Sequence, residues 1–201
     1  MELRCREALT DREKAAAEEI VCREYVRSGY LVPGGNGDTR LPSSAYLDTP
    51  QARTCILEWN TRIIGTVSVV VDSSRGVPMD ALYKQELDLW RAREKLLAEV
   101  VQLAIDESIF DQFGVLQRSF QRLRFLAPLF QTALDYAESA HIALLCITVN
   151  PKHDGLYARI GFQTVGEPKP YGALNEAPTV GKVLELDASA KKFLQDSFLK
   201  P

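Results

Sequence analysis

The sequence predicts a single α/β domain over residues 1–201, with a mixed central sheet flanked by helices. Apolar runs of strand length alternate with longer helical patterns along the chain, which is the arrangement typical of such a sheet. The apolar runs lie at 54–59, 63–71, 96–105 and 142–149. Hydrophobic residues make up 46% of the 201 positions, which is enough for one sizeable core and short for two.

The first fifty residues predict one helix followed by a long loop. Residues 10–13 (TDRE) form a capping-box pattern, in which the Thr and Glu side chains bind free amides at a helix start. Ser28 and Gly29 would end this helix. Residues 31–50 hold three Gly and three Pro, so they are expected to form a loop, and loops of this length are often functional.

A pair of strands and a helix come next. The strands at 54–59 and 63–71 would be joined by a turn at 60–62. Gly65 lies inside the second strand and predicts a bulge or a close backbone approach, because it has no side chain to pack. Residues 79–93 have a helical pattern.

The second half of the chain predicts the rest of the sheet. The run at 96–105, LLAEVVQLAI, could be strand or helix, and its Val pair and flanks favour a strand. A helix is expected at 115–139, with a kink or break at Pro128. Further strands would complete the sheet at 142–149, after Gly161 and at 179–187.

Composition excludes several classes of protein. A net charge of −3 and the absence of a Lys/Arg block argue against nucleic-acid binding. We expect no signal peptide and no transmembrane segment, because no run approaches about 18 apolar residues. The four cysteines form no CxxC pair, and Cys146 is expected in the core, so cysteine usage predicts a reducing, cytoplasmic compartment. With only two histidines, no metal site is expected.

Residues 149–162, VNPKHDGLYARIGF, are the most informative stretch. They combine a strand end, a Pro stop, a short helix that carries a Tyr, and a Gly-led turn into a new strand. That order resembles the late part of the GCN5-related N-acyltransferase (GNAT) fold. The resemblance implies this fold here, together with transfer of an acyl group from a thioester to an amine. A Tyr on the helix often protonates the leaving thiolate in that family.

Glu99 is a carboxylate inside the apolar run LLAEVVQLAI. A buried carboxylate requires a partner or a function, because its charged form loses hydration. In an apolar cleft its pKa would rise toward a value suited to a general base, which an amine nucleophile needs because it arrives protonated. The alternatives are an edge position that faces water and an ion pair with Arg or Lys.

Three candidates follow the strand at 142–149. Tyr157 could give a proton to the thiolate, or it could be a core residue with a hydrogen-bonded hydroxyl. His153, at the start of the short helix, could contact substrate or relay a proton; a solvent-facing ring is the alternative. Asn150, in the NPKH segment, is expected to contact substrate.

The segment at 106–125, DESIFDQFGVLQRSFQRLRF, differs from the usual acyl-CoA enzymes. Those enzymes carry a Gly-rich turn here, whose amides at a helix N-terminus bind the CoA pyrophosphate. This segment holds one Gly and no such cradle. Five of the eight phenylalanines fall instead within 21 residues: Phe110, Phe113, Phe120, Phe125 and Phe130.

These phenylalanines could wall a tunnel for a long acyl chain, with substrate contacts expected from Phe110, Phe113 and Phe120. A helix that packs its apolar face on the sheet is the alternative. Arg118 and Arg122 are one helical turn apart and could meet the acidic surface of a carrier protein, or they could belong to a solvated charged face.

A narrower resemblance covers roughly residues 15–187. The chain resembles the N-acyl amino acid synthases, the FeeM-type enzymes, in five segments taken in this order: EIVCREYVRSGYL, IIGTVSVVVDSSRGVPMDALYKQELDLWRA, LLAEVVQLAIDES, VNPKHDGLYARIGF and APTVGKVLELD. Those enzymes are similar in fold to the homoserine-lactone autoinducer synthases. They take the acyl chain from acyl carrier protein rather than CoA. The resemblance therefore implies a long-chain fatty acyl donor on the phosphopantetheine of acyl carrier protein, an amino-acid acceptor, and no tightly bound cofactor.

The same resemblance implies roles for individual residues. Glu99 matches the strand carboxylate proposed as base in the autoinducer synthases, within an E-x-x-R pattern, and Gln102 replaces the usual Arg here. The amides near Leu103 and Ala104 would polarise the thioester carbonyl, as a bulged fourth strand does in this fold. Asp48 lies where the relatives place acidic loop residues.

Other functions stay open on the sequence alone. They are an acyl-CoA-dependent N-acetyltransferase with a degenerate phosphate loop, an autoinducer-type enzyme that uses S-adenosylmethionine as acceptor, and a non-catalytic module that binds an acyl chain or a carrier protein. The acceptor amino acid is not identified. Its carboxylate would suit an Arg, and four lie in or near the acceptor-side region: Arg23, Arg27, Arg40 and Arg53.

Overall fold

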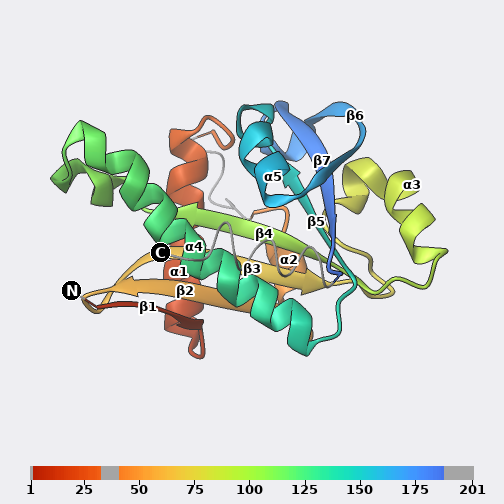
Figure 1. The fold of residues 1–201 in the computed structure, drawn as a ribbon, viewed down its shortest axis with the longest axis horizontal. Helices are drawn as coiled ribbons and strands as arrows, with labels where there is room; N and C mark the ends of the chain where they lie inside the picture. Colours follow the sequence, from red (N-terminus) through yellow and green to blue (C-terminus); the bar gives the residue numbers. More distant parts are fainter. Residues whose placement is uncertain (1, 33–40, 188–201) are drawn as a thin grey trace.

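The computed structural model describes residues 2–32 and 41–187. Within these ranges, seven strands form one sheet in the order β1-β2-β3-β4-β5-β7-β6 (Figure 1). The strands are β1 (Leu3–Glu7), β2 (Arg53–Trp59), β3 (Arg62–Val71), β4 (Leu97–Ile105), β5 (Leu144–Val149), β6 (Gln163–Tyr171) and β7 (Ala177–Glu185). Strands β4 and β5 are parallel, whereas the other neighbours are antiparallel. The mixed α/β sheet is confirmed.

Helices cover both faces of this sheet. They are α1 (Asp11–Arg27), α2 (Ser44–Leu47), α3 (Asp80–Arg91), α4 (Val115–Ser139) and α5 (Asp154–Ile160), with short 3₁₀ turns η1 (Glu107–Gln112), η2 (Pro151–His153) and η3 (Gly172–Leu174). On β2, Ile56 belongs to the same buried hydrophobic cluster as Ala17 of α1. The next residue, Leu57, belongs to the hydrophobic cluster that contains the buried residues of α4. Because neighbouring strand side chains point to opposite faces, α1 and α4 lie on opposite sides (Figure 1).

Several local predictions are confirmed by hydrogen bonds and close contacts. The Thr10 hydroxyl accepts the Glu13 amide at 3.2 Å, and the Glu13 carboxylate accepts the Thr10 amide at 3.0 Å, so the capping box opens α1. The run at 96–105 is strand β4. A Cβ atom on Gly65 would lie 3.1 Å from the Ala104 carbonyl oxygen, so Gly65 does mark a close approach of two backbones. Cys146 is fully buried in the core.

Three elements differ from the sequence-based expectations. Strand β1 was not predicted, although LRCRE alternates in character, because five residues carry little signal. The predicted loop at 31–50 contains the single turn α2. Of the predicted kink or break at Pro128, the break does not occur, since α4 continues through Pro128 as one helix. Because Pro128 has no N–H group, the Arg124 carbonyl loses its helical hydrogen bond. Arg124 is exposed, so a water molecule can donate to that carbonyl instead.

Candidate active site

A cavity of about 510 Å³ opens where β4 and β5 separate. The two parallel strands pair only from Leu97 to Glu99 of β4, opposite residues 144–146 of β5. Beyond that point β4 pairs only with β3 and β5 only with β7, and Figure 1 shows β4 and β5 diverging. The second half of β4 and the end of β5 therefore line the cavity with backbone as well as side chains.

Strand β4 carries a bulge beside this cavity. Ser68 of β3 pairs with Val101, and Thr66 pairs with Ala104, so Gln102 and Leu103 together face one β3 residue. Gln102 has a φ of 54°, in the left-handed region that non-Gly residues seldom adopt. Its side-chain amide donates to the Ser43 hydroxyl at 3.1 Å. A bulge interrupts the ladder of hydrogen bonds between two strands, and this is how a strand can present backbone amides to a ligand. Gln102, Leu103 and Ala104 all line the cavity.

Glu99 lies where the two strands begin to separate. It is only 3% exposed, and its carboxylate accepts the Met79 amide at 2.5 Å. Burial raises the pKa of Glu99 to about 8; the Met79 hydrogen bond opposes this rise, and the charge of Asp80 adds to it. The edge position that faces water is excluded by this burial. A carboxyl group with a pKa near neutrality, in a cavity, can both accept and release a proton.

The turn that donates the Met79 amide is held by a compact ion network. The Asp80 carboxylate accepts the Val77 amide at 2.9 Å and the Arg91 guanidinium at 2.8 Å. Arg91 also forms two hydrogen bonds to Asp72, at 2.7 and 3.0 Å. This network fixes the segment GVPMD, which is why that segment presents its amide to Glu99 in a defined position.

Strand β5 and the segment after it bring three predicted residues to the cavity. Asn150 and His153 line it, and Asn150 accepts the Lys152 amide at 3.1 Å. Partial burial and the charge of Lys152 lower the pKa of His153. Tyr157 lines the cavity from α5 and packs edge-on against Phe162. Burial raises the pKa of Tyr157 to about 12, so its hydroxyl keeps a proton at neutral pH.

The structure does not bring the phenylalanines together as one tunnel wall. Of the five, only Phe110 lines the cavity. Phe113 and Phe125 pack against Trp59 with ring centroids 6.0 and 5.8 Å away. Phe120 is 67% exposed. That expectation is therefore corrected, because most of these rings belong to the packing of α4 on the sheet or face solvent.

The remaining predicted residues lie at the rim or beyond it. Arg122 lines the cavity, pairs with Glu107 at 2.5 Å and stacks on the Phe110 ring. Arg118 lies one turn earlier on α4, 3.6 Å from Asp111. Asp48 follows α2 and is not among the described residues that line the cavity.

The four arginines considered for the acceptor carboxylate are separated by the structure. Arg23 and Arg53 do not line the cavity; Arg23 pairs with Asp106 and with Glu24 at the cavity wall, and Arg53 pairs with Glu7. Arg27 lines the cavity and lies 3.6 Å from Glu24. Arg40 lies outside the described residues.

Several lining residues were not singled out by the sequence. Tyr25, in the last turn of α1, and Tyr30, three residues beyond its end, form an edge-to-face pair with centroids 5.6 Å apart. The Tyr30 amide donates to the Tyr25 carbonyl at 2.8 Å, which turns the chain back toward the cavity. Lys152 and Tyr171 line other walls. Only the fold brings these distant segments together, so their spacing carried no signal.

Within residues 2–32 and 41–187, no helix is both long enough and apolar enough to span a membrane. The same ranges contain no group of three His, Cys, Asp or Glu side chains placed to hold a metal ion.

Comparison with known proteins shows the family. The family described as N-acyl amino acid synthase FeeM matches residues 16–185. The structure of FeeM, an N-acyl amino acid synthase from uncultured soil microbes, is 33% identical and matches with a TM-score of 0.78, covering 92% of each chain. No curated protein sequence matches this chain significantly.

More distant structures share the fold. A polyamine N acetyltransferase of Drosophila melanogaster is 12% identical, with a TM-score of 0.64 over 92% of this chain and 100% of that one. A GNAT-family acetyltransferase from Streptococcus pneumoniae is 17% identical, with a TM-score of 0.56 over 92% and 100% of the two chains. The chain is thus an acyltransferase with the GNAT fold, and it belongs to the FeeM family of N-acyl amino acid synthases.

Proposed function

We propose that this enzyme transfers a long-chain fatty acyl group from the phosphopantetheine thioester of an acyl carrier protein to the amine of an amino acid. The observation that carries the proposal is Glu99, buried at the point where β4 and β5 separate, with a pKa raised to about 8. A thioester that enters between the two strands has its carbonyl beside the β4 bulge. The acceptor amine then approaches that carbonyl from the side of Glu99.

In the proposed reaction, the amine nitrogen forms a bond to the thioester carbon, and the carbon–sulfur bond breaks. Glu99 takes the proton that the amine must lose, directly or through water. Amides of the bulge at Leu103 and Ala104 stabilise the oxyanion. Tyr157, which keeps its proton at neutral pH, donates it to the departing thiolate. Asn150 and His153 line the same cavity and contact the substrates. Positioning supplies much of the rate, because a neutral amine is a good nucleophile.

The segment after β4 supports a carrier protein rather than CoA as donor. Where acyl-CoA enzymes place a Gly-rich turn, this chain has Asp106, Glu107 and the 3₁₀ turn η1. The Asp106 carboxylate accepts a hydrogen bond from Arg62 at 2.6 Å, and it also accepts the Ser108 amide at 3.1 Å. This turn therefore offers paired carboxylates in place of a Gly-rich series of amides for a pyrophosphate, whereas a phosphopantetheine arm carries a single phosphate.

The first turns of α4 supply a docking surface for the carrier. Four large apolar side chains there are solvent-exposed: Val115, Leu116, Phe120 and Leu123. Arg118 and Arg122 lie among them, and Arg122 also lines the cavity. A surface that combines apolar contacts with guanidinium groups suits a small acidic protein and leads directly to the cleft.

A product search tests this proposal. Purified protein would be mixed with long-chain acyl carrier protein and the twenty amino acids, with the Glu99→Gln variant in parallel, and products would be identified by mass spectrometry. A new N-acyl amino acid, strongly reduced in the variant, is the expected result. Product from acyl-CoA alone would favour a CoA-dependent N-acetyltransferase instead. Bound acyl carrier without any product would indicate a binding module.

A further inference from the structure

In the part of the chain that the structure describes, three cationic side chains line the cavity, and they differ in how they are paired. Arg122 is bound to Glu107 at 2.5 Å, and Arg27 lies 3.6 Å from Glu24. Lys152 has no carboxylate partner among the described residues; its ammonium lies instead 5.4 Å from the centroid of the Tyr30 ring. Lys152 is therefore the cation in this part of the cavity wall that can accept an anionic ligand without breaking an ion pair.

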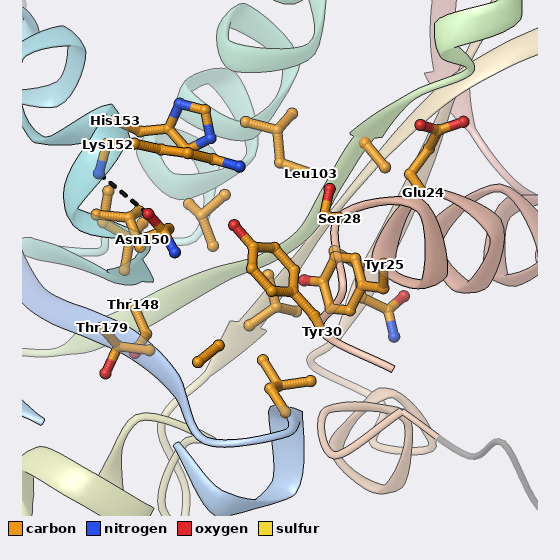
Figure 2. A pocket seen from close by; sticks show the side chains of 18 of the residues that line it. Glu24, Tyr25, Ser28, Tyr30, Leu103, Thr148, Asn150, Lys152, His153 and Thr179 are labelled. Carbon is orange, nitrogen blue, oxygen red and sulfur yellow. Dashed lines mark hydrogen bonds between the residues drawn. The ribbon is translucent and has the colours of Figure 1, made fainter. Parts of the chain in front are cut away.

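The backbone around Lys152 is held firmly. Asn150 accepts the Lys152 amide at 3.1 Å, and Pro151 begins the 3₁₀ turn η2. The side chain then extends from this turn across the cavity toward Tyr30 (Figure 2). A fixed start and an extended stem place the ammonium in the cavity rather than out in bulk water, even though part of Lys152 is exposed.

Tyr30 adds a second polar group that lacks a partner. Its hydroxyl is buried and has no hydrogen-bond partner within residues 2–32 and 41–187. Figure 2 shows this hydroxyl on the side of the ring that faces Lys152. A buried hydroxyl without a partner is costly, so a ligand atom that accepts its hydrogen is favoured. One negatively charged oxygen ligand could pair with the ammonium and accept from the phenol together.

We infer that Lys152 and Tyr30 form the subsite for the carboxylate of the acceptor amino acid. This inference rests on the proposed function, in which Glu99 takes a proton from the amine of the same molecule. The amine end of the acceptor thus meets a proton acceptor and its carboxylate end meets a cation, on two walls of one cavity. Acceptors that lack the carboxylate lose one of these contacts, so Lys152 selects amino acids over simple amines.

The test compares an amino acid with its primary amide, which keeps the amine and side chain but lacks the negative charge. For the wild-type chain, kcat/KM should favour the amino acid. In Lys152→Met, kcat/KM for the amino acid should fall about ten- to hundredfold, while the value for the amide stays nearly unchanged. Lys152→Arg should keep most of the preference. Arg27→Met is the matched control and should keep it fully.

The outcomes separate this inference from the proposed function. If Lys152→Met lowers both values equally, or if Arg27→Met and not Lys152→Met removes the preference, the carboxylate subsite is elsewhere. If the wild-type chain makes no product with any donor, the proposed function fails. Binding of an N-acyl amino acid and of its amide, measured by calorimetry, then still reports on Lys152: equal loss of affinity for both ligands in Lys152→Met would overturn the subsite.

Discussion

The exchange of Glu99 for Gln tests the proposed proton transfer, and its size follows from the burial of the carboxyl group. With a pKa of about 8, roughly a tenth of Glu99 is ionised at pH 7 and about half at pH 8. Measured at saturating acceptor, kcat of the wild-type chain should therefore rise about fivefold over that interval and level off above about pH 9. In Glu99→Gln, kcat should fall about a hundred- to ten-thousandfold, and the rise near pH 8 should disappear.

Stability gives an independent readout of the same pKa. The pKa of Glu99 is about 8 in the folded protein and 4.5 without burial, so the folded state holds the proton more tightly. The free energy of unfolding should thus fall as pH rises from about 5 to about 8, by about 5 kcal/mol in total. Glu99→Gln lacks this loss, so its stability relative to the wild-type chain should increase with pH.

Two assays check these expectations together. Product formation is followed across about pH 6 to 10, and urea unfolding is measured at about pH 5, 7 and 9 for both chains. An unchanged kcat in Glu99→Gln would refute the role of Glu99 as base. A slow variant that keeps the rise near pH 8 would assign that titration to another group. A stability difference that is constant with pH would refute the burial argument.

Four further substitutions, in three tests, probe the surroundings of the site. Gly181→Ala would place a Cβ atom 3.0 Å from the buried Tyr83 ring, so it should lower the free energy of unfolding by about 1–3 kcal/mol. An unchanged midpoint of urea unfolding would contradict this packing. Lys182 is 1% exposed and pairs with Asp154 at 2.7 Å, so Asp154→Asn should lower the free energy of unfolding by about 3 kcal/mol. Adding Lys182→Met to that variant should recover part of the loss, because no unpaired buried charge remains. If the losses from the two substitutions simply add, the two residues are not coupled. Tyr157→Phe should slow kcat for poor thiol leaving groups more than for good ones, and an equal effect on both would remove Tyr157 as the proton donor.

The sheet and the position of Glu99 followed from local pattern. An apolar run of strand length with one embedded carboxylate is visible without any knowledge of neighbours, and its burial leaves few options for that charge. The bulge at Gln102 was not visible in the same way, because it depends on the register between β3 and β4. Gly65 carried part of that information, since its backbone approaches Ala104 closely.

The walls of the cavity depended on tertiary packing. The phenylalanines after β4 were clustered in sequence, but a helix distributes such residues over several faces, so only Phe110 reaches the cavity. Tyr30 and Lys152 lie in distant segments and meet only because α1 and η2 end beside the same opening. No spacing within either segment indicates that contact.

In the proposed reaction, the cleft receives an acyl chain from a carrier protein and passes it to an amino acid. The most direct test offers equal concentrations of acyl carrier protein and acyl-CoA, with the two acyl chains differing in isotope, and measures the isotope ratio in the N-acyl amino acid formed. We expect product that carries almost entirely the carrier-borne chain, with one free carrier thiol released per product. Product that carries mainly the chain from CoA would show that a carrier protein is not the preferred donor.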